Sequence, residues 1–394
     1  MKAIIGELLI DANGIKKNTV VLIKGERIVK IGSSKDVEVP PEAEVIDASD
    51  SVLMPGMIDC HVHFEGSEKG EPLKFTESYE TRLIRAAVHE TRQLLESGFT
   101  SVIDAGGLVG LHVRNAINEG IIPGPRIIAS GRYISVTGGH GDTHYLPLEW
   151  VKEGRPMGWW PMDGRIADGV DECIRAVREQ LREGVDIIKI ITSGGGESIR
   201  DPWYVPEYTF EEIKTMVHIA HSWGRRVMAH SHNPEGIRRS VLADVDVIIH
   251  AKHVDEEAIK LMLEHGTIVV STMSWSYIEN RPCGADIYKK LYDGGVTIAL
   301  GTDTMGSPIP FGKNAIELEC FVEEVGLNPF EAIKIGTLNG AKAMGIKDLG
   351  TIEAGKLADI IAVEKNPLED IKSLQDKNNI KFVMKEGEIY KNNL

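Results

Sequence analysis

Long apolar runs, basic runs and closely spaced cysteines are all missing from this sequence of 394 residues. No stretch approaches the roughly 20 apolar residues of a membrane span. The first residues, MKAIIGELLIDANG, contain Glu7 and Asp11 where a secretory signal peptide needs an unbroken apolar core. We therefore expect a cytoplasmic protein without a membrane-spanning segment.

The cysteines show neither a C-x-x-C spacing nor the density of a disulfide framework. There are four, scattered along the chain: Cys60, Cys173, Cys283 and Cys320. The sequence therefore predicts free thiols.

Positive charge is scarce, because 44 lysines and arginines stand against 59 aspartates and glutamates, for a formal net charge of -15. Proteins that bind nucleic acid or anionic membranes normally carry a basic patch or stripe. Since no run of Lys or Arg occurs, we expect neither nucleic acid nor a membrane as a partner, and a small-molecule substrate instead. A homo-oligomer is compatible with the sequence but does not follow from it.

Both ends of the chain are rich in short β-branched runs broken by turns. These are AIIGELLI, TVVLIKG and RIVKIG near the N-terminus, and DIIAVEKNP and IKFVMKEGEIYK near the C-terminus. Because they flank a long middle of different character, we expect residues 1–55 and 349–394 to pair as one small sheet domain.

The middle, residues 56–348, alternates short apolar runs with amphipathic helical stretches. In residues 165–184, apolar side chains recur at the period of a half-buried helix: Ile166, Val170, Ile174, Val177 and Leu181. The apolar runs are MIDCHVH, TSVIDAGG, RIIASG, DIIKIITSG, RVMAHSH, DVIIHA, TIVVST and VTIALGTD. Such alternation predicts parallel strands joined by helices, and eight units predict an α/β fold, a closed (β/α)8 TIM barrel.

Ionisable side chains stand on these strands or just beyond their predicted ends, at the barrel face where active sites lie. They are His61, His63, Lys189, His230, His250 and Asp303. Each alone has an ordinary explanation: a strand-end histidine is often a satisfied core or surface residue, Lys189 could reach the rim, and Asp303 could cap a helix. Their joint placement at one face favours an active site.

The ligand chemistry of this set points to metal. Four imidazoles and a carboxylate suit zinc or a neighbouring divalent ion. A single zinc with three or four protein ligands would leave some of these residues unused, whereas two ions would use all of them if something bridged the pair. Lys189 lies between isoleucines in IIKII, where an ammonium is costly unless it is neutral or chemically modified.

The motifs PGMIDCHVHF, IKIITSGG, MAHSH, IIHA and ALGTD resemble the successive strand motifs of the amidohydrolase superfamily, over essentially the whole chain. The β-rich ends resemble that superfamily's small β-sandwich domain, and LGTIEAGKLADIIAVEKNP resembles its C-terminal return. TGGHGD, residues 137–142, resembles the branch of metal-dependent Xaa-Pro and Xaa-Arg dipeptidases, ochratoxin-type amidases and relatives of imidazolonepropionase. IIHA departs from that branch, in which Glu-His-Gly is more familiar, and this weakens any inference about the substrate.

The resemblance implies a ligand arrangement for two divalent ions, zinc by preference. His61, His63 and Asp303 would hold one ion, and His230 and His250 the other. Lys189 would carry a CO2-derived carbamate whose two oxygens bridge the ions. His232 is an alternative ligand, but it lies one strand step beyond His230, and we expect it to face the substrate.

The same resemblance implies hydrolysis by a hydroxide that bridges the two ions. Asp303 would take the proton and pass it to the leaving amine. His140, in TGGHGD, is the candidate for stabilising the oxyanion or binding a substrate carboxylate. The alternative for His140 is a loop residue beside glycines that a tight turn needs.

Two long loops, residues 137–164 and 194–208, exceed the usual barrel connection and are candidate lids. They carry aromatic residues that could line a pocket or pack within a lid: Trp159, Trp160, Trp203 and Tyr204.

The expected function is therefore binuclear metal-dependent hydrolysis of a carbon–nitrogen amide bond, in dipeptides or N-acyl amino acids. Hydrolysis of a cyclic amide, as by imidazolonepropionase, or of a lactone is the alternative. Deamination is disfavoured because the mononuclear deaminases of this superfamily typically lack the strand-four lysine. A non-catalytic scaffold would be expected to lack ligands, and none is missing.

Overall fold

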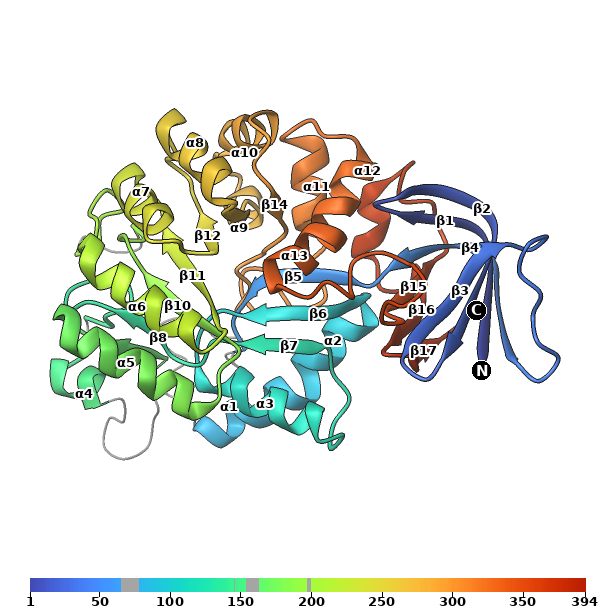
Figure 1. The fold of residues 1–394 in the computed structure, drawn as a ribbon, viewed down its shortest axis with the longest axis horizontal. Helices are drawn as coiled ribbons and strands as arrows, with labels where there is room; N and C mark the ends of the chain where they lie inside the picture. The colour runs from blue at the N-terminus through green and yellow to red at the C-terminus, as the bar shows by residue number, and fades with distance from the viewer. Residues whose placement is uncertain (65–77, 145, 154–162, 197–199) are drawn as a thin grey trace.

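The computed structural model describes residues 1–64, 78–144, 146–153, 163–196 and 200–394. Figure 1 shows two parts, a β domain that contains both termini and a larger assembly of strands and helices.

The β domain is built from both ends of the chain. Its seven strands lie in the order β17-β16-β15-β4-β1-β2-β3. β15 pairs antiparallel with β4, so that Ile360 lies opposite Pro55 and Val363 opposite Val52. The two ends therefore join one sheet, as predicted. The strands are β1 (Lys2–Asp11), β2 (Gly14–Lys24), β3 (Arg27–Ser33), β4 (Glu44–Pro55), β15 (Ile360–Val363), β16 (Ile380–Lys385) and β17 (Glu388–Asn392).

In the larger part, each of the eight predicted apolar runs contains one parallel strand. They are β5 (Met57–Val62), β6 (Phe99–Asp104), β7 (Arg126–Ala129), β10 (Ile187–Ile191), β11 (Arg226–Ser231), β12 (Val247–His250), β13 (Ile268–Val270) and β14 (Ile298–Ala299). The amide of Cys60 donates to the carbonyl of Leu300 at 2.8 Å, which joins the first strand to the last. The amide of Asp186, just before β10, donates to the carbonyl of Ala129, the last residue of β7, at 2.9 Å. This bond joins the third predicted strand to the fourth. The predicted fold class, a (β/α)8 barrel with a β domain from the termini, is confirmed.

Helices follow the barrel strands and cover their outer side (Figure 1). Every residue of β5 and β10 is buried, because one face of a barrel strand lines the interior and the other packs against helices. The helices are α1 (Tyr79–Arg85), η2 (Ala86–Glu90), α2 (Thr91–Glu96), α3 (Leu108–Asn118), α4 (Leu148–Glu153), α5 (Gly169–Glu183), α6 (Phe210–Ser222), α7 (Pro234–Leu242), α8 (Glu256–His265), α9 (Ser274–Ile278), α10 (Ala285–Asp293), α11 (Ile316–Glu323), α12 (Pro329–Lys334), η4 (Ile335–Asn339), α13 (Gly340–Met344) and η5 (Ile371–Gln375).

The helix predicted over residues 165–184 is shorter than expected. Ile166 belongs instead to β9 (Gly164–Ile166), which pairs with β8 (Tyr133–Ser135) at the edge of the second barrel sheet. α5 begins only at Gly169, so Val170 is 39% exposed. The predicted apolar face was therefore wrong at its first two positions, because a strand pairing distant in sequence takes Ile166 out of the helix.

Two simpler expectations can also be compared with the structure. The four cysteines are all buried and unpaired, as predicted. Within the described ranges, no helix combines the length and the apolar character needed to cross a bilayer.

Candidate metal centre

The barrel brings the six predicted ligands to one region. His61 lies in β5 and His63 directly after it, while Asp303 lies four residues beyond β14. Lys189, His230 and His250 lie in the neighbouring strands β10, β11 and β12. Because parallel strands in a barrel end on the same face, these side chains meet at the C-terminal end of the barrel.

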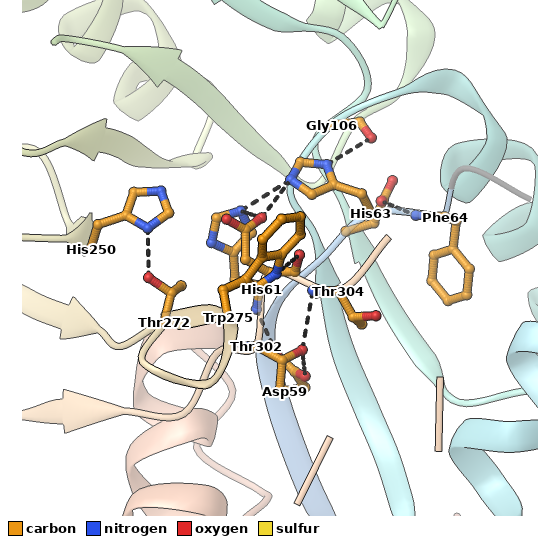
Figure 2. Close-up of polar contacts among 12 residues, drawn as sticks. Asp59, His61, His63, Phe64, Gly106, His250, Thr272, Trp275, Thr302 and Thr304 are labelled. Carbon is orange, nitrogen blue, oxygen red and sulfur yellow. Dashed lines mark hydrogen bonds and ion pairs between the residues drawn. The ribbon is translucent and has the colours of Figure 1, made fainter. Parts of the chain in front are cut away.

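Three atoms converge on one point beside β5. Nε2 of His61 and Nε2 of His63 are 3.1 Å apart, and Oδ1 of Asp303 lies 3.2 Å from each of them (Figure 2). Zinc bonds of about 2.0–2.2 Å at tetrahedral angles place neighbouring ligand atoms roughly 3.3–3.6 Å apart. These three atoms are therefore close to the separation that ligands of one ion require.

A second group of imidazoles lies next to the first. The ligand atoms of His230, His232 and His250 are within 4.8 Å of one another, and those of His250, His61 and Asp303 form an overlapping group. Nδ1 of His250 shares a hydrogen bond of 2.7 Å with Thr272 Oγ1, so its Nε2 is the nitrogen left for the centre (Figure 2). Nε2 of His230 is buried and has no hydrogen-bond partner in the described part of the chain. A buried polar atom without a partner calls for an explanation, and a cation supplies one.

The electrostatics of the cluster suit a cation. Burial lowers the pKa of each of the four buried imidazoles well below its usual value: His61, His230, His232 and His250. Burial opposes ionisation of Asp303, but the imidazoles of His61 and His63 outweigh it and lower the pKa of this carboxyl. Neutral imidazoles and an ionised carboxylate are the forms that bind divalent metals, so the donor set fits such ions.

Lys189 lies on β10 among isoleucines and is only 3% exposed. Burial lowers the pKa of its amine to about 7, although the Asp303 carboxylate opposes the shift. Much of this amine is therefore neutral near pH 7, and a neutral amine is the form that reacts with CO2.

His140 lies over the centre rather than in an isolated turn. Its ring stacks on His230 with centroids 4.3 Å apart, and its Nδ1 is 2.7 Å from Oδ2 of Asp201. The His140 peptide N–H donates to Glu207 Oε1 at 2.7 Å. A Cβ at Gly195 would come within 2.2 Å of the His140 ring, so only glycine allows this close approach.

His232 lies in the imidazole cluster, with its ring stacked on His250 at a centroid distance of 4.6 Å. The geometry allows it to bind a metal or a substrate, and its assignment to substrate stays a prediction. Among the loop aromatics, Trp203 stacks on His253 at 3.7 Å, and Tyr204 is 63% exposed. Trp159 and Trp160 lie outside the described residues.

Several residues around the centre were not predicted from the sequence. Asp59 is fully buried and accepts from the His61 amide at 3.0 Å and from Thr302 Oγ1 at 2.7 Å (Figure 2). It also accepts from Asn314 Nδ2 at 2.7 Å. Its position two residues before His61, on the same side of β5, was a usable signal. Thr272 and Asp201 had no such signal, because their partners are distant in sequence.

Comparisons with known proteins show which family the chain resembles. The model of the amidohydrolase family matches residues 52–390. Ochratoxinase of Aspergillus niger is 35% identical, over 98% of this chain and 85% of that protein. The match to the crystal structure of the A. niger ochratoxinase covers 99% of this chain and 95% of that chain, with a TM-score of 0.92 and 34% identity. The crystal structure of a Xaa-Pro dipeptidase with bound methionine in the active site has a TM-score of 0.86 at 34% identity, covering 99% of both chains. An imidazolonepropionase of Idiomarina loihiensis is 25% identical, over 88% of this chain and 86% of that protein.

Proposed function

Because the chain belongs to the amidohydrolase family, we propose that it hydrolyses a carbon–nitrogen amide bond, in dipeptides or N-acyl amino acids, with two divalent metal ions. The observation that carries this proposal is the convergence of two imidazole nitrogens and a carboxylate oxygen within 3.2 Å beside a second imidazole group. Similarity to an ochratoxinase and a Xaa-Pro dipeptidase supports the substrate class.

The ligands divide between two adjacent positions. His61, His63 and Asp303 would hold one ion, and His230 and His250 would hold the other. Lys189, if carboxylated on its amine, would supply carbamate oxygens as further ligands. Zinc is the ion that this set of imidazoles and carboxylates fits best. When bound, the pair of ions supplies a water of lowered pKa and polarises the substrate carbonyl.

The remaining chemistry belongs to the side chains. Asp303 takes a proton at its carboxylate and delivers it to the leaving amine as the carbon–nitrogen bond breaks. The neighbouring imidazoles favour the ionised form of this carboxylate by lowering its pKa, and only the ionised form can accept a proton. His140 and His232 contact the substrate, and His140 is oriented for this by Asp201 at 2.7 Å.

The proposal is tested by metal analysis together with a substrate screen. We expect the protein, purified with zinc or manganese, to contain close to two divalent ions per chain. The loaded protein should release amines from members of a library of dipeptides and N-acyl amino acids. Saturation at one ion per chain would contradict the binuclear site. Activity on cyclic amides or lactones alone would favour the alternative, which the similarity to an imidazolonepropionase supports.

The role of His140 is tested by His140→Ala. We expect the metal content to be unchanged and kcat/KM to fall by about 10²-fold, the size of losing one group that stabilises the oxyanion. The loss should be largest for substrates with a free carboxylate. His265→Ala is a control, because that histidine is the last residue of α8 and its Nδ1 lies 2.9 Å from Oδ1 of Asp244. Unchanged kinetics for His140→Ala would show that His140 is only a structural residue of the turn and has no role in catalysis.

A further inference from the structure

Two of the proposed metal ligands have a strained backbone. Asp303 has φ 58° and His250 has φ 72°, both in the left-handed region that non-glycine residues rarely adopt. Such conformations persist only where the surrounding structure holds them. The contacts of these two residues therefore bear on how the metal centre is shaped.

The backbone carbonyl of each strained ligand accepts a hydrogen bond from an aromatic side chain. Nε1 of Trp275 donates to the carbonyl of Asp303 at 2.8 Å (Figure 2). The hydroxyl of Tyr288 donates to the carbonyl of His250 at 2.7 Å. The two aromatic residues lie on successive helices, α9 and α10, which connect β13 to β14.

Both helices are well anchored behind the centre. Glu317, buried on α11, accepts from the amides of Met273 and Ser274 at 2.9 and 2.8 Å, at the start of α9. Tyr288 is fully buried, and its oxygen also accepts from the Thr272 amide at 3.2 Å. The side chain of Thr272 in turn contacts Nδ1 of His250. Contacts within the protein therefore hold both donors in place.

We propose that Trp275 and Tyr288 are positioning residues, each of which locks one metal ligand in its left-handed conformation. Trp275 acts on Asp303, in the group with His61 and His63. Tyr288 acts on His250, in the group with His230. The connection between β13 and β14 thus sets the geometry of the two metal positions independently. The effect on metal affinity rests on the two-ion site of the proposed function, and the effect on rate rests in addition on its amide hydrolysis.

The experiment uses Trp275→Phe and Tyr288→Phe, which remove the donor and keep an aromatic ring. The fully loaded protein is titrated with a chelator, so that the two ions leave in two steps. We expect each variant to lower the affinity for one of the two ions by about tenfold, which is the lower end of the losses seen when an outer-shell partner of a metal ligand is removed. The ion that is bound less tightly should differ between the two variants, and the double variant should bind both ions less tightly.

Kinetics provide a second readout on any amide that the wild type hydrolyses. Trp275→Phe should lower kcat by about tenfold, the size of one lost buried hydrogen bond, with KM within about twofold. Trp223→Phe, at a tryptophan 66% exposed beyond α6, and Tyr390→Phe, in the β domain, are controls expected to change neither readout.

The outcomes separate this inference from the proposed function. Unchanged release of both ions from both variants would overturn the positioning role, even if thermal stability fell. Equal weakening of the same ion in both would overturn the independence of the two positions. Should Trp275→Phe fail to fold, Tyr288→Phe, which loses a single oxygen, decides alone. A wild type that binds two ions but hydrolyses no amide would refute the proposed function and leave the chelator result valid.

Discussion

Lys189→Ala is expected to abolish metal binding and activity together. If Lys189 carries the proposed bridging carbamate, its removal would take a ligand from both metal positions at once. Loss of even an outer-shell partner costs about 10–100-fold in metal affinity or activity, so we expect a fall of more than about 100-fold in kcat/KM. Elemental analysis should find well below two ions per chain.

A matched control distinguishes this role from the loss of a buried lysine. Lys385 lies on β16, is 5% exposed and donates to the carbonyl of Gly124 at 2.9 Å, outside the metal centre. Lys385→Ala should lower thermal stability and leave metal content and kcat unchanged. Formate or acetate should restore part of the activity of Lys189→Ala, since a small carboxylate supplies the same two oxygens.

The wild type adds a direct test of the modification. Mass or density for one CO2 unit should be found on the Lys189 amine at neutral pH in the loaded protein. A fully active Lys189→Ala variant, or an unmodified amine directed away from the imidazoles, would overturn the binuclear arrangement proposed for this chain.

Asp303→Asn is expected to separate catalysis from metal binding. The amide keeps an oxygen that can bind an ion, but it cannot accept and return a proton. Proton transfer by a positioned side chain contributes about 10²–10⁴-fold to rate. We therefore expect kcat to fall by that factor, with KM little changed and metal content partly retained, as measured by steady-state kinetics and elemental analysis.

The control for this variant lies at the opposite end of the barrel. Asp246 directly precedes β12 and contacts Nε2 of His221 at 2.9 Å and the Val227 amide at 2.8 Å. Residues at this face of a barrel contribute to stability rather than to the active site. Asp246→Asn should lower thermal stability and leave kcat unchanged. A near-normal kcat for Asp303→Asn would show that Asp303 does not transfer the proton.

The barrel could be predicted from the sequence because its signals are local. Eight apolar runs separated by amphipathic stretches are visible without any tertiary contact, and each run contains one parallel strand of the barrel. The candidate ligands could be located for the same reason. His61 and His63 are two residues apart at the end of a strand, and a barrel requires such strand ends to meet.

The predicted start of α5 was wrong because the helical periodicity of the segment competes there with a strand pairing to a distant part of the chain. Ile166 fits the helical period of the residues that follow it, but it pairs with β8 through Ser135. Periodicity describes only the residues within one segment. It contains no information about a strand some thirty residues away that competes for the same backbone hydrogen bonds.

The sequence by itself determined the fold class, the β domain built from both ends, and the set of ionisable residues at the strand ends. Only the tertiary structure decided how those residues meet: the 3.1 Å approach of two imidazole nitrogens, the stacking of His140 on His230, and the donors that hold Asp303 and His250. The physical reason is that strands and helices follow from the periodicity of neighbouring residues. A hydrogen bond from Trp275 to Asp303, by contrast, joins residues 28 apart in the chain and exists only once the barrel has closed.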